Sequence, residues 1–236
     1  MKKLSDTQEN TVMNEILEGS CRNPHEFLGM HQVSGGVVVR IYDPEAESAS
    51  VIVGNKRYPM TKENEQGIFT CLFARRKNLF AYEVEKKYAD STFTSADPYC
   101  FLPTLGEMDI YLFNQGEHQR VYDVMGAHVR NLGGVGGVSF AVWAPNAQRV
   151  SVVGDFNCWD GRRHPMRMLG LSGIWELFIP GLKPGDVYKF EVKGSDGSIV
   201  LKLDPYARRT ELRPNNAGIV PQAEPFQQKH LQKTLH

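Results

Sequence analysis

Two aspartates in one short segment, Asp155 and Asp160, are of the residue type that acid–base chemistry on a sugar uses. A retaining glycosidase needs two carboxyl groups about 5 Å apart across a cleft, with the pKa of one of them raised. A loop alone supplies neither the cleft nor a way to raise a pKa, so we interpret this pair as capping a turn. The sequence therefore predicts no catalytic residue.

The histidines and cysteines also lack the spacing of a metal site or of a disulfide framework. The histidines have no metal-ligand spacing, and the cysteines form no C-x-x-C pair, which favours buried or idle thiols over a disulfide framework or a zinc site. The residues concerned are His31, His128, His164, Cys21, Cys71, Cys100 and Cys158. We expect neither a metal nor a cofactor.

Aromatic and polar residues in the second half of the chain suit the binding of a sugar. A pyranose has an apolar face of C–H bonds that stacks on an aromatic plane, and polar side chains reach its hydroxyl rim. Alternation along a strand turns Trp143 away from Val138, Phe140 and Val142, and by the same test it turns Lys189 outward. The candidate carbohydrate-binding residues are Trp143, Lys189, Trp159 and Asn157.

Each candidate also has a purely structural interpretation. Trp143 would suit a seam with a neighbouring domain, and Trp159 would anchor its own loop. Asn157 would organise a turn, and Lys189 would be a solvated charge on a strand face. Trp175 is assigned to the core, because its register in the strand points inward.

The strands that must position these residues belong to a segment that the sequence contains in two copies. Residues 36–44 return as 137–145, and four further motifs follow in the same order. They are 51–54 with 151–154, 59–60 with 165–166, 67–69 with 173–175, and 97–99 with 204–206. The copies lie about 100 residues apart, which is a domain-sized period and longer than the unit of a solenoid or propeller.

The two copies differ where the candidate site lies. The second copy has the long segment 154–166, whereas the first has only 54–60. By this match Trp143 corresponds to Tyr42, and Lys189 corresponds to Ala81, so the first copy keeps an aromatic and loses the amine. A sugar site is therefore expected in the second copy.

Both copies show the period-two alternation of half-buried strands, separated by turns rich in Gly, Pro, Asn and Asp. This pattern predicts an all-β fold of two tandem immunoglobulin-like antiparallel β-sandwiches. A short helix is predicted at 6–18, with Ser5 and Gln8 as a capping box and Gly19 as its end. The predicted organisation is a first sandwich with its leading helix at 1–110, a packed connector at 111–122, a second sandwich at 123–220 and a disordered tail at 221–236.

Charge and hydropathy exclude several classes of partner. Lys plus Arg equals Asp plus Glu, 27 each, so there is no basic field for a nucleic-acid backbone. No apolar run approaches the roughly 20 residues of a membrane span, and the first residues lack the apolar stretch of a secretory signal. We expect a cytoplasmic protein that binds neither nucleic acid nor membrane.

The motifs of the second copy resemble the starch- and glycogen-binding module of glycogen branching enzymes. The resemblance rests on residues 140–147, 154–166, 188–191 and 204–207. The first copy, through residues 23–25, 28–31 and 97–99, resembles the extra amino-terminal domain of the longer bacterial forms. Together the resemblance covers about residues 23–220.

Members of this family continue into an α-amylase-type barrel that carries the catalytic carboxylates, and nothing in the sequence resembles that barrel. The resemblance implies the non-catalytic amino-terminal region of a 1,4-alpha-glucan branching enzyme, inactive alone, with α-1,4-glucan or glycogen and the catalytic barrel as partners. Glucan binding near millimolar is expected, strengthened by avidity on glycogen. Two alternatives remain open, namely interaction domains that only support the barrel, and a free-standing glycogen-targeting subunit.

Overall fold

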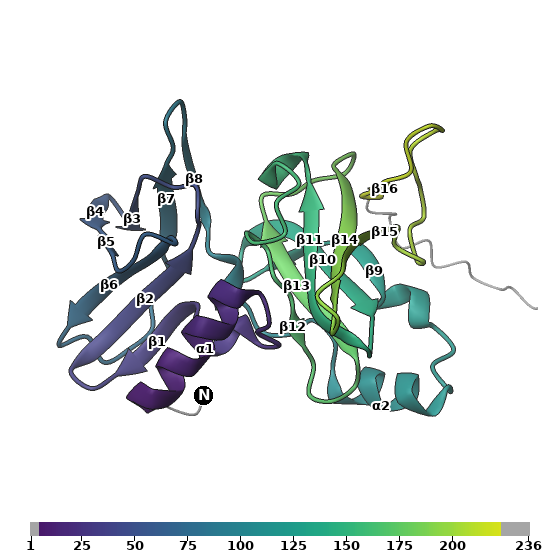
Figure 1. The fold of residues 1–236 in the computed structure, drawn as a ribbon, viewed down its shortest axis with the longest axis horizontal. Coiled ribbons are helices and arrows are strands. Elements are labelled where there is room, and N and C mark those ends of the chain that lie inside the picture. Colours follow the sequence, from purple (N-terminus) through teal and green to yellow (C-terminus); the bar gives the residue numbers. More distant parts are fainter. Residues whose placement is uncertain (1–4, 223–236) are drawn as a thin grey trace, which may run out of the picture.

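The computed structural model describes residues 5–222, and it contains two β-sandwiches that lie side by side (Figure 1). Its four sheets are built from antiparallel strand pairs, which confirms the predicted all-β class. A disordered tail is predicted at 221–236, and residues 223–236 of it lie outside the described residues. The domain boundaries inferred from the sequence remain predictions.

The first sandwich consists of a sheet in the order β1-β2-β6-β5 and a sheet in the order β4-β3-β7-β8. Its strands are β1 Gly29–Val33, β2 Gly36–Tyr42, β3 Ser48–Val53, β4 Lys56–Pro59, β5 Thr61–Lys62, β6 Ile68–Ala74, β7 Glu83–Lys87 and β8 Thr92–Ala96. Short 3-10 helices, η1 Pro24–Glu26 and η2 Pro98–Cys100, flank these strands.

The second sandwich repeats this plan with a sheet β12-β13-β10-β9 and a sheet β11-β14-β15, in which β16 also pairs with β14. Its strands are β9 Gly126–Leu132, β10 Val135–Trp143, β11 Ala147–Gly154, β12 Arg167–Met168, β13 Ile174–Pro180, β14 Val187–Gly194, β15 Ile199–Lys202 and β16 Gly218–Ile219. The 3-10 helices η3 Val121–Asp123 and η4 Asp155–Asn157 precede β9 and follow β11.

Helix α1 spans Asp6–Glu18, as the sequence predicts. The Ser5 hydroxyl accepts from the Gln8 N–H, the Gln8 side chain accepts from the Ser5 N–H, and Gly19 ends the helix in the left-handed conformation with a φ of 65°. Gly19 also lies against the Arg149 guanidinium of β11, where a Cβ would come within 2.5 Å of a nitrogen. The helix therefore ends on the second sandwich.

A helix that the sequence analysis missed, α2 at Glu107–Gln115, overlaps the start of the predicted connector at 111–122. Ile110 and Phe113 of α2 pack on a small cluster that includes Ala141 of β10 and Ile174 of β13. The apolar spacing is too short to stand out in the sequence, because a helix of this length shows barely two turns of periodicity. Within the described residues no helix has the length and apolar character that crossing a bilayer requires.

One apolar cluster spans the seam between the two sandwiches. It joins the core of the second sandwich to side chains of the first domain, whereas a separate cluster fills the first sandwich. The first-domain members are Ile16, Cys21, Phe27, Leu28, Tyr42, Ile68 and Tyr99, and those of the second include Phe140, Val150, Val152, Met166, Trp175 and Tyr188. Burial of apolar surface holds the two sandwiches together, so they are packed units and not tethered ones.

The sequence repeat is also a repeat of hydrogen bonds. The Tyr82 hydroxyl donates to Asp97 and the Tyr188 hydroxyl donates to Asp204, and both hydrogen bonds are buried and 2.6 Å long. Because Tyr82 and Tyr188 occupy the same place, the residue that corresponds to Lys189 is Glu83, the next residue in the first copy. The predicted correspondence with Ala81 is wrong, since motif matching alone did not fix the register of this strand.

The repeated tyrosine–aspartate bond leads to a prediction for both domains. Burial raises the pKa of Asp204, and the Tyr188 hydroxyl counteracts this shift by donating to the carboxylate. Tyr188→Phe should lower the free energy of unfolding by about 1–3 kcal/mol, because it leaves a buried acceptor with one donor fewer. Tyr82→Phe is the matched change in the first copy. Urea denaturation of both variants checks this, and midpoints equal to that of the wild type would contradict it.

Candidate functional site

The loop between β11 and β12 is organised by the side chain of Asn157. Its Oδ1 accepts from the Gly154 N–H at 3.0 Å, and its Nδ2 donates to the Val152 carbonyl at 2.9 Å and to His164 Nδ1 at 2.8 Å. The residue is 1% exposed. Asn157 therefore holds both ends of the loop together from inside, and this position removes it from any surface that a sugar could reach.

Trp159 follows at an unusual backbone position. Cys158 and Trp159 have φ values of 57° and 60°, in the left-handed region that costs a non-glycine residue about 1–2 kcal/mol. The Trp159 N–H donates to the Gly154 carbonyl at 2.9 Å, and the indole N–H donates to Asp155 Oδ1 at 2.9 Å. Strain of this kind persists where surrounding contacts impose it, and it often marks a functional site. Here it fixes a half-buried indole at the edge of the sandwich.

The loop lies over the outer face of the sheet β11-β14-β15. Gly161 packs against the carboxylate of Glu191 on β14 so closely that a Cβ there would overlap it. Pro165 forms an isolated bridge with Ser151 of β11. Glu191 is two residues from Lys189 on the same face of β14, and Lys189 is opposite Val153 in the β11–β14 register. The Trp159 loop and Lys189 therefore share one end of one sheet.

Asn216 joins this surface, and the sequence analysis did not find it. Its side-chain oxygen accepts a hydrogen bond from the Lys189 ammonium. The segment around it leads into β16, which pairs with β14 at Val187 and Tyr188. Asn216 stands in a run of turn-forming residues, and no sequence pattern separates a ligand-facing asparagine there from one that only forms the turn.

Trp143 lies on the other sheet. It is the last residue of β10 and points outward, as alternation predicts, with 53% of its surface exposed. Its ring is 6.2 Å from that of Phe113 on α2, with a tilt of 59° between the planes. Trp175, by contrast, is fully buried in the core, as predicted. The four predicted site residues thus do not form one site, since Trp143 is separated from Trp159 and Lys189 by the thickness of the sandwich.

The two aspartates of the loop, Asp155 and Asp160, accept hydrogen bonds from side chains of the same loop. Asp155 accepts from the Trp159 indole, and Asp160 accepts from Arg162 through several bonds, the shortest 2.7 Å. Burial would raise the pKa of Asp160, but Arg162 outweighs it and keeps that pKa below the ordinary value. An acid catalyst needs the opposite shift. This geometry agrees with the assignment of both aspartates to the turn.

His164 is a partly buried titratable group at the end of the loop. Burial, with the nearby positive charge of Lys86, lowers the pKa of His164 to about 3. The ring is therefore neutral near pH 7, and its Nδ1 accepts the hydrogen bond from Asn157. The ring of Phe156 packs edge-on against it, with 5.6 Å between centroids.

Two family models match the chain, one on each sandwich. The model for the N-terminal domain of alpha-1,4-glucan branching enzyme GlgB matches residues 9–99. The model for carbohydrate-binding module 48, described as the isoamylase N-terminal domain, matches residues 124–207.

Similar solved structures are much longer than this chain. A putative alpha amylase from Salmonella typhimurium is 28% identical over 42% of this chain and 15% of that chain, with a TM-score of 0.32. Pullulanase type I from Bacillus subtilis str. 168, complexed with maltose, is 16% identical over 80% of this chain and 26% of that chain, with a TM-score of 0.36. In both comparisons this chain spans well under two thirds of the solved protein.

Acid should weaken the fold through His164. Above pH 6.5 the ring is neutral in both the folded and the unfolded chain, whereas between pH 6.5 and about 3 only the unfolded chain takes up the proton. Stability is therefore lost as the pH falls, by up to about 1.4 kcal/mol per pH unit. Between pH 7.5 and 5.0 the wild type should lose about 2 kcal/mol more than His164→Gln, which keeps an acceptor for Asn157.

Urea unfolding at the two pH values measures this difference. Burial also lowers the pKa values of His25, His31 and His128. These histidines titrate in both proteins, so the comparison isolates His164. Equal losses for wild type and variant would show that His164 does not carry the effect.

The matched ranges follow the same order as the two sandwiches. The first contains β1 to β8, and the second contains β9 to β15 together with Trp143, Trp159 and Lys189. The two matches together support an N-terminal region of a branching-type enzyme, in which a domain matched by the GlgB N-terminal model precedes one matched by carbohydrate-binding module 48.

Proposed function

We propose that the second sandwich binds α-1,4-glucan at the surface formed by Trp159, Lys189 and Asn216, called the glucan face below, and holds glycogen for a catalytic barrel of the same enzyme. The observation that carries the proposal is the joint placement of Trp159 and the Lys189–Asn216 pair at one end of the sheet β11-β14-β15. An aromatic plane beside a cluster of donors is the arrangement that a glucose ring requires.

The three side chains would make different contacts with the sugar. The Trp159 indole has its N–H engaged by Asp155, so the ring's contribution to a ligand would be stacking and not hydrogen bonding. Lys189 brings an ammonium with three donors, one of which is used on Asn216. That bond orients the Asn216 amide so that its nitrogen can donate to a hydroxyl. Sugar hydroxyls would thus meet donors, and the pyranose face would meet the ring.

A site of this size binds weakly. One or two stacked rings and a few solvated hydrogen bonds leave about 4 kcal/mol after the entropy cost of association, which corresponds to a dissociation constant near millimolar. Glycogen presents many chain ends, so several such contacts would raise the apparent affinity through avidity. Weak and reversible binding suits a domain that holds a polymer while another domain acts on it.

A second candidate function rests on Trp143. Its exposed ring and the neighbouring helix α2 form a surface on the opposite sheet that a following domain could cover. In that case the sandwiches would support a barrel without touching sugar, or would form the body of a glycogen-targeting subunit. The first candidate requires Trp159 for glucan binding, whereas the supporting role requires no tryptophan for it.

Retention in a native gel that contains glycogen separates these candidates. Trp159→Ala should weaken binding about tenfold, because it removes the stacking plane. Lys189→Met should weaken it several-fold, because it removes the charge and donors but keeps an apolar side chain of similar length. Trp143→Ala is the matched control, a tryptophan removed from the other sheet, and it should migrate like the wild type.

Each variant needs an unchanged urea midpoint before its retention is interpreted. Loss of retention in Trp143→Ala with normal retention in Trp159→Ala would move the site to the opposite sheet. A wild-type chain that glycogen does not retard at all would favour the supporting role.

A further inference from the structure

We infer that the first sandwich positions the glucan face, by gripping the loop that carries Trp159 through Asp43. This inference rests on the proposed function, because it assigns the first domain a part in the same site. The grip is made of three polar contacts that cross the seam. Arg163 pairs with Asp43 at 3.3 Å, Arg162 pairs with Glu45 at 2.8 Å, and the Tyr99 hydroxyl donates to the Pro165 carbonyl at 3.2 Å.

Asp43 is the most buried of these attachment points. It follows β2 directly and is 1% exposed. Within the first domain it accepts from the Tyr88 hydroxyl at 2.7 Å and pairs with Lys86 at 3.1 Å. Burial by itself would raise the pKa of Asp43, but Lys86, Tyr88 and Arg163 outweigh it and hold the pKa below the ordinary value. The carboxylate is therefore charged, and Lys86 and Tyr88 of its own domain hold it in place.

Arg163 enters the first domain from the loop. Its side chain is 12% exposed, and its guanidinium lies over the Tyr88 ring, 4.9 Å from the centroid. A carboxylate on one side and an aromatic face on the other suit a planar guanidinium better than an ammonium. Without Asp43 this cation would remain buried beside Lys86, a like charge, which is strongly unfavourable.

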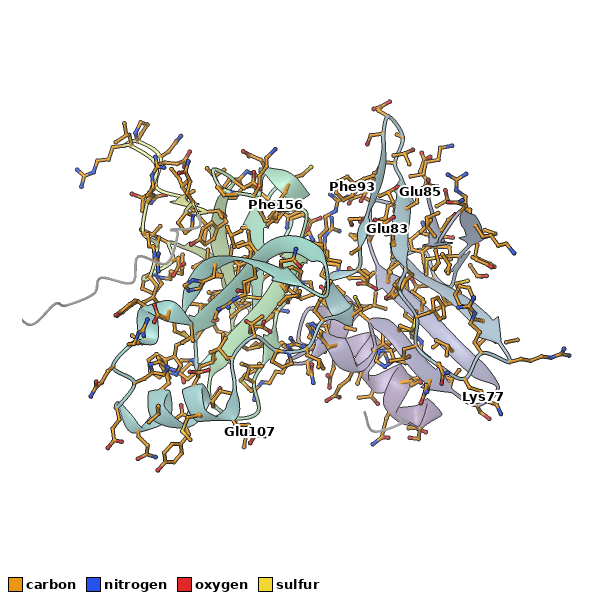
Figure 2. All side chains as sticks on the ribbon, turned by 180° about the vertical axis from the view of Figure 1, so that it is seen from behind. Lys77, Glu83, Glu85, Phe93, Glu107 and Phe156 are labelled. Atoms are coloured by element: carbon orange, nitrogen blue, oxygen red, sulfur yellow. The ribbon has the colours of Figure 1, made fainter. Side chains whose placement is uncertain are left out.

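The grip reaches Trp159 through a short chain of backbone bonds. The Arg163 N–H donates to the Asp160 carbonyl at 3.2 Å, and the Asp160 N–H donates to the Asn157 carbonyl at 3.1 Å. Trp159 lies between Asn157 and Asp160, which are joined by the second of these bonds. Phe156 of the same loop and Phe93 of β8 lie on facing sides of the seam (Figure 2), where they line one small pocket with Asp43 and Arg163.

The difference between the two copies explains why such a grip is needed. The first copy connects its strands by residues 54–60, whereas the second uses 154–166. A longer loop loses more conformational entropy when it is held in one shape. Polar contacts to a second domain reduce the number of shapes that the free loop samples, and a pre-organised loop binds its ligand more tightly.

Calorimetric titration of the 236-residue chain with maltoheptaose tests the inference. Asp43→Asn and Arg163→Met should each weaken binding about threefold to tenfold, and the double variant should be no weaker than the worse single variant, because both remove the same contact. Arg163→Lys should recover part of the affinity, since it keeps the charge. Arg57→Gln is the control, because it breaks an ion pair with Glu85 in the same domain, where Arg57 is 65% exposed, and it should bind like the wild type.

Amide hydrogen exchange supplies a readout that general destabilisation would not give. In Asp43→Asn the amides of residues 157–163 should exchange at least about tenfold faster, while those of β13 keep wild-type rates. Unchanged affinity in Arg163→Met, which alters the loop and leaves the first sandwich intact, overturns the inference, and this variant decides the question if Asp43→Asn does not fold.

The same titration separates failure of the inference from failure of the proposed function. If Trp159→Ala loses binding while Asp43→Asn and Arg163→Met keep it, the glucan face stands and the positioning role falls. If Trp159→Ala binds like the wild type, the glucan face itself is wrong, and the inference falls with it.

Discussion

The side-chain amide of Asn157 is the interaction on which the candidate site depends. A long loop with little regular structure must be held in one conformation, and ordering it costs about 1–2 kcal/mol per residue in backbone entropy. Asn157 offsets part of that cost by bonding the start of the loop at Gly154 and its end at His164. The left-handed backbone at Trp159 follows from this closure, and the neutral ring of His164 accepts one of the bonds that make it.

The two sandwiches have similar folds but different roles. Both contain the buried tyrosine–aspartate bond, and the strand order β1-β2-β6-β5 of the first sandwich recurs as β9-β10-β13-β12 in the second. They differ at the end of one sheet, where the first copy has Glu83 and a short connection and the second has Lys189 and the Trp159 loop. A carboxylate offers no donors when ionised, so the first copy lacks the donor that we assign to sugar binding. Its role in our account is to hold the loop of its neighbour.

Much of this fold could be predicted from the sequence, because strand alternation and the domain-sized repeat are local patterns. The limits of α1 followed from Ser5, Gln8 and Gly19, whose chemistry fixes both ends of a helix without tertiary information. Helix α2 was missed because its packing face is set by the second sandwich. Asn157 and Asn216 show the limit for the site, since two asparagines in turns have the same sequence signal although one is buried and the other faces solvent. Which sheet carries Trp143 and which carries Lys189 depends on sheet order, and residue spacing does not encode sheet order.

The central claim is that Trp159 is the tryptophan that meets glucan. The chain has three tryptophans, and their indole N–H groups give three separate signals in a proton–nitrogen correlation spectrum. On titration with maltoheptaose the Trp159 signal should shift progressively, while those of exposed Trp143 and buried Trp175 stay in place. A shift of the Trp143 signal with a stationary Trp159 signal would contradict the account, and so would three stationary signals at saturating sugar.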